Sequence, residues 1–232
     1  GGAFASALRS TASFVHATIA DNDAASSGGG IAAASGSAVA VASSVLWGNT
    51  AVVSGQAAQI VEFTGGAAAV SHSIVQDLAG SAGRSGNLSL NPLFLDAALG
   101  DYRLAHGSPG IDAGDGSVLP PDSFDVDGDG DDTEPLPADV ALSARVVDDP
   151  SAPDVGVPVD TLGLVPDMGA FERSASCPED LDGDGEVGLS DVLSVVAAWG
   201  PCEIGGCPAD FDDNQMVDLE DLLVVISAWG SC

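Results

Sequence analysis

Short runs of apolar and β-branched residues recur along residues 1–95, and each run ends in a polar turn. Three of them lie at residues 17–22, 44–49 and 73–77. Their central residues Ile19, Val45 and Ile74 are 26 and 29 residues apart, and a second pair, at 28–31 and 57–60, is 29 apart. Repeats of this length, built from short strands and small residues, predict a stack of coils, a β-helix. A β-sandwich is the alternative fold.

The hydrophobic pattern changes to a helical period near the C-terminus, and it does so twice. The first set, at i, i+3, i+4, i+7 and i+10, is Leu189, Val192, Leu193, Val196 and Trp199. The second set is Leu219, Leu222, Leu223, Ile226 and Trp229. Each set predicts a helix that buries this stripe, with its Trp in the core. Gly200 and Gly230 are placed to end the two helices.

These helices belong to a tandem repeat. Residues 177–202 align with 207–232 without a gap, and 13 of 26 positions are identical. Each helix follows an acid-rich loop with oxygen-bearing side chains at alternate positions, as in loops that wrap one calcium ion. The expected ligands are Asp180, Asp182, Asp184, Glu186 and Asp191 in the first loop and Asp210, Asp212, Asn214, Met216, Asp218 and Asp221 in the second. Glu186 and Met216 would supply backbone carbonyls.

Charge divides the chain into three sections. Residues 1–95 carry four acids, residues 96–176 carry 18 and residues 177–232 carry 13, against five Arg and no Lys in all 232 residues. We expect β-helix coils in the first section, their C-terminal cap with an Asp-rich insertion in the second, and the calcium loops in the third. The net charge of −30 argues against binding to nucleic acid or to an anionic membrane. No apolar run is long enough to insert into a membrane.

Another acid-rich loop lies in the second section, at residues 125–132. Its acids at alternate positions are Asp125, Asp127, Asp129 and Asp131. Together with the two Gly between them, they match the first half of a calcium loop. The twelfth position is Leu136, so a closing ligand would have to come from Glu134 or Asp139. A third calcium ion and a plain solvated loop are both open at this point.

Four short motifs follow the repeats of the first section. They are Pro-Leu-Phe at 92–94, Asp-Tyr-Arg-Leu at 101–104, Ser-Pro-Gly-Ile-Asp-Ala-Gly-Asp at 108–115 and Asp-Met-Gly-Ala-Phe-Glu at 167–172. As a set they resemble the C-terminal end of right-handed parallel β-helix repeat proteins of bacterial surfaces, over about residues 14–173. The resemblance implies a mainly β chain, a right-handed parallel β-helix with a capped last coil, and no active site in the cap.

A second resemblance covers residues 177–232. Two loop–helix units without a helix before either loop, framed by Cys and ending in Gly-x-Cys, resemble a dockerin, most closely the GC-type dockerin-like domain of bacterial exported proteins. This resemblance implies an α-helical module with two calcium ions and a cohesin-like or cell-surface anchoring partner. Gln215 stands where the second loop needs Gly, which predicts a weaker or strained second site. Residues 189–190 and 219–220, at the recognition positions, match no specificity that can be assigned.

All four Cys lie in the last section, which indicates two disulfides and an oxidising location, extracellular or on the bacterial cell surface. A structural zinc site is the alternative. A helix of 11 residues spans about 16 Å, so a bond from Cys177 to Cys202 would need the entry segment to run the length of the helix. If the two units pack antiparallel about a pseudo-two-fold axis, the pairs become Cys177–Cys232 and Cys202–Cys207, which we predict.

Residues 1–95 offer no catalytic set. They hold two Arg, four scattered acids, and His16 and His72, which we expect to be ordinary strand residues. We therefore expect an exported, calcium-binding, non-catalytic β-helix protein, attached or assembled through its C-terminal module, with a polysaccharide as a further ligand. The alternatives are the C-terminal part of a polysaccharide hydrolase or lyase with its catalytic coils upstream, and a calcium-stabilised adhesin. Because the chain begins Gly1-Gly2 without Met, we expect a C-terminal fragment or a processed form.

Overall fold

The structure is a computed structural model of the chain. It describes residues 2–52, 54–78, 86–105, 107–149, 152–159, 161–173, 178–182, 186–202, 207–212 and 214–231. The chain divides into two compact units, one of residues 1–148 with 152–172 and one of residues 149–151 with 173–232. Each unit is described by itself. Among the described residues, no helix is long and apolar enough to cross a membrane.

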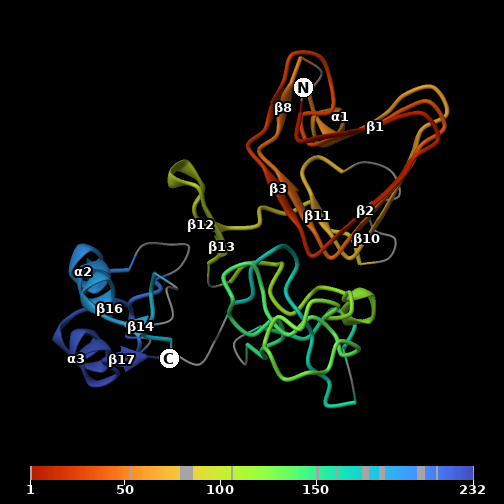
Figure 1. The fold of residues 1–232 in the computed structure, drawn as a ribbon. Helices are drawn as coiled ribbons and strands as arrows, with labels where there is room; N and C mark the ends of the chain where they lie inside the picture. The colour runs from red at the N-terminus through yellow and green to blue at the C-terminus, as the bar shows by residue number, and fades with distance from the viewer. Residues whose placement is uncertain are drawn as a thin grey trace. The chain divides into compact units, whose positions relative to one another are not determined.

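Parallel strands form the first part of unit 1 (Figure 1). Three sheets contain three strands each: β1 (Phe4–Ser6), β5 (Ile31–Ala33) and β9 (Ile60–Glu62); β2 (Thr11–Val15), β6 (Ala38–Ala42) and β10 (Ala67–Ser71); β3 (Thr18–Ala20), β7 (Val45–Trp47) and β11 (Ile74–Val75). A fourth sheet pairs β4 (Asp23–Ala24) with β8 (Thr50–Ala51). A short helix, α1 (Gln56–Gln59), precedes β9.

The strand register corrects one spacing inferred from the sequence. Ile31 pairs with Ile60 and Val45 with Ile74, both 29 residues apart as expected. Between the first two rows the offset is 27, so Ile19 pairs with Leu46 and not with Val45. A slip of one residue in a strand exchanges the two faces of the sheet, and the apolar run at residues 45–47 did not reveal which of its residues matches Ile19.

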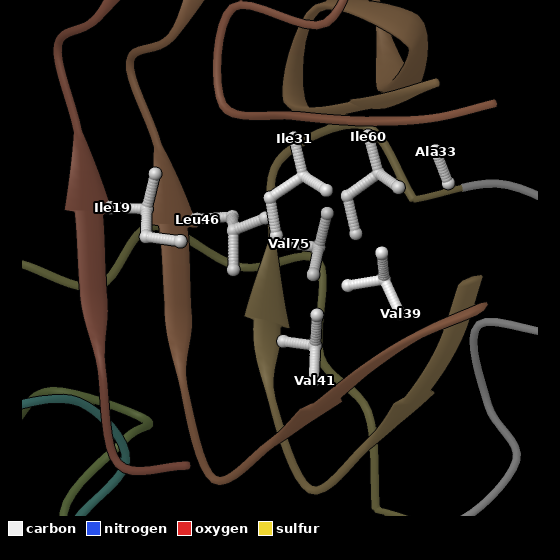
Figure 2. Packing of buried hydrophobic residues seen from close by; sticks show 8 residues of the cluster. All are labelled: Ile19, Ile31, Ala33, Val39, Val41, Leu46, Ile60 and Val75. Atoms are coloured by element: carbon white, nitrogen blue, oxygen red, sulfur yellow. The ribbon is translucent and has the colours of Figure 1, made fainter. Parts of the chain in front are cut away.

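The interior of this part is made of small aliphatic side chains (Figure 2). Alternate residues of the strands point inward, so that Val39 and Val41 of β6 are buried while the residues flanking Val39 are exposed. The cluster consists of Ile19, Ile31, Ala33, Val39, Val41, Leu46, Ile60 and Val75. Three-strand sheets of so few residues bury little area per strand, so the interior depends on the match between rows.

The predicted fold class, a right-handed parallel β-helix with a helical module, is wrong for the described residues. Their strands contain two to five residues and form small separate sheets, some parallel and some antiparallel, and no sheet closes or continues as a solenoid. Left-handed residues interrupt the runs: His16, Ser43 and His72, with φ of 47°, 49° and 41°, follow β2, β6 and β10 directly. Such a residue turns the chain, so neighbouring apolar runs do not join into longer strands.

The rest of unit 1 contains little regular structure. A hairpin of β12 (Phe94–Asp96) and β13 (Asp101–Leu104) encloses the 3-10 turn η2 (Ala97–Leu99), and a second turn is η3 (Gly116–Val118). Val45 and Ile74 pack with Ala113 and Met168, so the loops of the second section cover the edge of the strands. The motif residues 167–170 belong to this packing, and Met168 is 1% exposed.

Unit 2 consists of two loop–helix units of the same shape. The helices are α2 (Leu189–Ala197) and α3 (Leu219–Ser227), and the short strands are β14 (Glu186–Val187), β15 (Gly200–Pro201), β16 (Met216–Val217) and β17 (Gly230–Ser231). Strand β14 pairs antiparallel with β17, and β15 pairs antiparallel with β16. The strand before each helix therefore meets the strand after the other helix, as the predicted pseudo-two-fold arrangement requires.

The core of unit 2 is not the stripe predicted from the helical pattern. Buried positions are Val187, Val195, Ala209, Val217 and Val225, with Val192 and Leu222 half-buried against them. The two Trp were expected in the core, but Trp199 is 51% exposed and Trp229 is 58% exposed. Each helix carries apolar residues on two faces, and periodicity alone does not say which face packs inward.

Candidate metal centre

The first loop closes on a buried carboxylate at the start of α2. Asp191 is 1% exposed. Its Oδ1 accepts hydrogen bonds from the N–H groups of Leu181 at 2.7 Å and Asp182 at 3.1 Å, and its Oδ2 accepts from Gly188 at 2.7 Å. The carboxylate thus joins both ends of the loop to the first turn of the helix, where the helix dipole also favours a negative charge.

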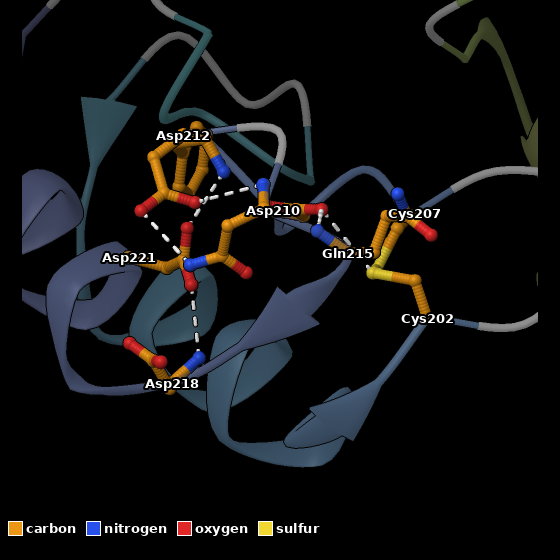
Figure 3. The surroundings of a disulfide bond; sticks show 9 residues. Cys202, Cys207, Asp210, Asp212, Gln215, Asp218 and Asp221 are labelled. Carbon is orange, nitrogen blue, oxygen red and sulfur yellow. Dashed lines mark hydrogen bonds between the residues drawn. A yellow bond between two sulfur atoms is a disulfide. The ribbon is translucent and has the colours of Figure 1, made fainter.

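The second loop repeats this arrangement at α3 (Figure 3). Asp221 is 0% exposed, and its two oxygens accept from Phe211 N–H at 2.7 Å and Asp218 N–H at 2.9 Å. Asp218, predicted as a ligand, has its Oδ1 on the N–H of Glu220 and caps the helix. Two loops related by the sequence repeat therefore place the same acid in the same buried position.

Other predicted ligands of the first loop gather beside Asp191. Asp180, Asp182 and Asp191 each place one carboxylate oxygen within 4.8 Å of the others. Asp184 lies outside the described residues, and for Glu186 the structure describes the backbone, in β14, and not the side chain. Oxygens this close can surround one hard cation whose ligands lie at about 2.3–2.6 Å.

In the second loop the predicted ligands fold back on the backbone. Asp210 accepts from Asn214 N–H at 3.1 Å and Gln215 N–H at 2.9 Å. Asp212 accepts from the N–H and the side-chain amide of Asn214, at 3.1 and 3.0 Å. These contacts hold the loop tight and direct the oxygens of Asp210, Asp212 and Asp221 to one side of it (Figure 3). Met216 lies in β16 with its side chain exposed, so a contribution from it would come from the carbonyl.

Gln215 has the backbone that the sequence called for in a Gly. Its φ is 69°, in the left-handed region, which costs a side chain with a Cβ about 1 kcal/mol. Its carbonyl accepts from Cys202 N–H at 3.0 Å, at the pairing of β15 and β16. The second loop is therefore strained at the point where the prediction placed its weakness.

The disulfide Cys202–Cys207 is present, with the two Cα atoms 5.5 Å apart. It confirms this predicted pair and leaves neither thiolate for a zinc site. The other predicted pair, Cys177–Cys232, lies outside the described residues. The Cys202–Cys207 bond adjoins the second loop, since Cys202 Sγ lies 3.4 Å from Asp210 Oδ2 (Figure 3).

The acid-rich loop of unit 1 is also defined. Asp125, Asp127 and Asp129 are exposed and bring one oxygen each within 4.8 Å of the others, and Asp131 accepts from the N–H and hydroxyl of Thr133. Of the two acids considered as the closing ligand, Asp139 instead binds the N–H groups of Ala141, Ser143 and Glu172. Glu134 groups with Asp127 and with Asp122, which the sequence pattern missed because it precedes the alternating acids.

A buried polar cluster that the sequence did not indicate ties the loops of unit 1 to β2. Arg145, 2% exposed, donates from Nη2 to the carbonyls of Asp167 at 2.8 Å and Gly169 at 3.1 Å. The same Nη2 lies 2.6 Å from His16 Nδ1, so His16 is a turn residue held by Arg145 and not the strand residue expected. Burial, then the Arg145 charge, lowers the pKa of His16 to about 3.

The partner of this arginine is also buried. Glu172 Oε2 lies 3.7 Å from Arg145 Nη2 and accepts from Asp167 N–H at 3.0 Å. Burial and the nearby charge of Asp167 raise the pKa of Glu172 well above its usual value. Both His16 and Glu172 bind backbone groups, so the contacts of this cluster are those of a structural clasp.

No family model, no curated protein and no solved structure matches this chain. The resemblances drawn from the motifs therefore enter only as proposals, and the geometry of the two repeated loops is the observation on which a function can be based.

Proposed function

We propose that residues 177–232 form a calcium-loaded, dockerin-like module through which this chain is attached to or assembled with a partner protein. The observation that carries the proposal is the duplication itself. Two loop–helix units each combine a buried acid at the helix start, acids at alternate loop positions and an exposed apolar stripe on the helix.

Calcium fits the chemistry of the loops better than a transition metal. The donors are carboxylate, amide and carbonyl oxygens, which hard cations prefer, and the nearest sulfur atoms are joined in a disulfide. Residues 177–232 contain 13 acids and no Lys or Arg, so a cation is needed to offset the repulsion among them. Gln215 makes the second site the weaker of the two.

The exposed apolar stripes are the surface that a partner would cover. On α2 they include Leu193 and Trp199, and on α3 the equivalent Leu223 and Trp229, all about half exposed or more. Repeated large apolar side chains on one short module are typical of protein interaction sites. Since the module is acidic and lacks bases, the partner is a folded cohesin-like domain whose apolar patch is bordered by Lys or Arg.

Unit 1 is then a non-catalytic structural or polysaccharide-binding part of an exported protein at the bacterial surface. Its buried titratable groups, His16, Arg145 and Glu172, are occupied by backbone groups and by one another. The disulfide of unit 2 supports an oxidising, extracellular location.

Calcium calorimetry on the full chain tests the metal part of this proposal. We expect Asp191→Asn and Asp221→Asn each to remove one site from the titration, because each loses the charge at a loop's closing ligand. Glu220→Gln, which changes the exposed neighbour of Asp221, is the matched control and keeps all sites. Equal titrations for wild type and both Asp variants would overturn the calcium assignment.

Binding to a panel of purified cohesin domains, with calcium and with chelator, tests the docking part. Wild type should bind at least one domain in calcium, and the pair Leu193→Asp with Leu223→Asp should weaken that binding at least tenfold. Leu142→Asp, at an exposed apolar residue of unit 1, serves as the control. Binding that survives the chelator or the paired substitution, or no binding to any cohesin domain, would count against docking.

A further inference from the structure

The acid-rich loop of unit 1 is closed at its base by backbone pairing. Pro121 and Pro135 form an antiparallel bridge. On either side of it, Asp122 N–H donates to Glu134 O at 2.8 Å and Leu136 N–H donates to Pro120 O at 2.9 Å. These contacts bring Asp122 and Glu134 to opposite sides of one neck, although 11 residues separate them in the chain.

Asp122 carries a buried oxygen with no hydrogen-bond partner. Its side chain is 0% exposed, its Oδ2 accepts from Val126 N–H at 2.7 Å, and its Oδ1 is inaccessible and unpaired. Glu134 Oε1 is likewise inaccessible and unpaired. Buried carboxylate oxygens nearly always have a partner, because leaving one unpaired carries the full cost of desolvation. Two such oxygens at one neck indicate a ligand that neither the backbone nor another side chain supplies.

A third acid completes the group. Asp122, Asp127 and Glu134 each place one oxygen within 4.8 Å of the other two. Oxygens bound to one calcium ion at about 2.3–2.6 Å can be no farther apart than about 5 Å. Residues 119–136 contain no Lys, Arg or His, so no cationic side chain of this loop can neutralise the group.

The exposed acids of the same loop are engaged differently. Asp125 accepts from Gly130 N–H at 3.1 Å, and Asp129 accepts from Asp131 N–H at 2.7 Å. Exposed Asp side chains that bind the backbone nearby are usual in turns and need no ion. The neck, in contrast, has carboxylate oxygens that are buried and unpaired.

We propose that the neck of residues 121–135 binds one calcium ion through Asp122, Asp127 and Glu134, with loop carbonyls and water completing the shell. The site is independent of the two loops of unit 2. It fixes the base of an insertion that otherwise consists of turns, and it gives unit 1 a calcium dependence of its own.

Hydrogen exchange measured by mass spectrometry on the full chain tests this site locally, with calcium chloride as the only added metal. The peptide covering residues 119–136 should gain protection in calcium in the wild type. Asp122→Asn keeps an acceptor for Val126 N–H but removes the charge, and it should raise the calcium concentration for half protection at least tenfold. Asp129→Asn, an acid of the same loop, should shift it by less than about threefold.

Several results would overturn the proposal. They are a wild-type peptide that calcium leaves unchanged, an unchanged Asp122→Asn variant, or a larger loss in Asp129→Asn than in Asp122→Asn, which would place the ion at the exposed acids. If Asp122→Asn fails to fold, Glu134→Gln replaces it, with the same expectation. Protection of the neck in a chain carrying both Asp191→Asn and Asp221→Asn separates this site from those of unit 2, so either proposal can fail alone.

Discussion

At the scale of single residues, backbone strain in the second calcium loop concentrates at Gln215. Its φ of 69° would suit Gly, whereas the four residues that continue the loop into α3 have no positive φ. We expect Gln215→Gly to stabilise the chain in calcium by roughly 0–1 kcal/mol, since relief of about 1 kcal/mol of strain is partly offset by the greater freedom of Gly when unfolded. Denaturant unfolding followed through α3 measures this.

A Gly in the nearby helix provides the control for that substitution. Glu220→Gly, in the first turn of α3, should destabilise by about 0.5–1 kcal/mol, because no strain is relieved there. A Gln215→Gly variant that loses as much stability as Glu220→Gly would contradict the assignment of strain.

His16 gives unit 1 a dependence on acid. Its folded pKa of about 3 lies below the ordinary value of 6.5, so the unfolded chain takes up a proton first as the pH falls. The stabilisation is complete above about pH 6.5 and is lost progressively toward pH 3, by an amount on the order of a few kcal/mol. His16→Asn, which tolerates the left-handed backbone and does not titrate, should lose less stability between pH 6.5 and 4 than the wild type.

Unfolding of unit 1 in denaturant at several pH values, with calcium constant, measures that difference. Glu172 acts in the opposite direction, since its raised pKa adds stability that is present at low pH and lost as the pH rises through that pKa. The comparison of His16→Asn with wild type removes this term from both chains. Parallel curves for the two proteins would rule out His16 as the source of the acid sensitivity.

At the scale of elements, neighbouring residues of α2 separate the core from the docking face. Val195 is 0% exposed and Val196 is 49% exposed. We expect Val195→Ala to lower the free energy of unfolding by about 1–3 kcal/mol through lost burial and a cavity. Val196→Ala should change it by less than about 0.5 kcal/mol. Thermal or denaturant unfolding of both variants checks this, and equal losses would show that the stripe of α2 is packed after all.

At the scale of the whole molecule, calcium should matter more to unit 2 than to the parallel strands of unit 1. The buried core of unit 2 is five small residues, which is too little for a unit of this size without further stabilisation. Each occupied site at 100 times its dissociation constant adds about 2.7 kcal/mol. Chelation should therefore abolish hydrogen-exchange protection in α2 and α3 while leaving β6 and β7 protected. Helices that stay protected in chelator would contradict the proposed dependence.

The amino-acid sequence determined the local features whose causes lie within a few residues. The positions of α2 and α3 follow from their apolar period, the strain at Gln215 follows from a side chain where a tight loop needs Gly, and the pair Cys202–Cys207 follows from the repeat and its two-fold packing. In the parallel strands, the spacing of 29 residues also gave the correct partners, Ile31 with Ile60.

The tertiary structure decided whatever depends on contacts between distant segments. The sequence could not show that the left-handed residues at His16 and His72 interrupt the strands, so the predicted β-helix was wrong. It could not choose the buried face of a helix with apolar residues on two sides, so the Trp residues were placed wrongly. Asp122 carries no motif, and it becomes a candidate ligand only because the pairing of Pro121 with Pro135 buries it opposite Glu134, where an unpaired charge is costly.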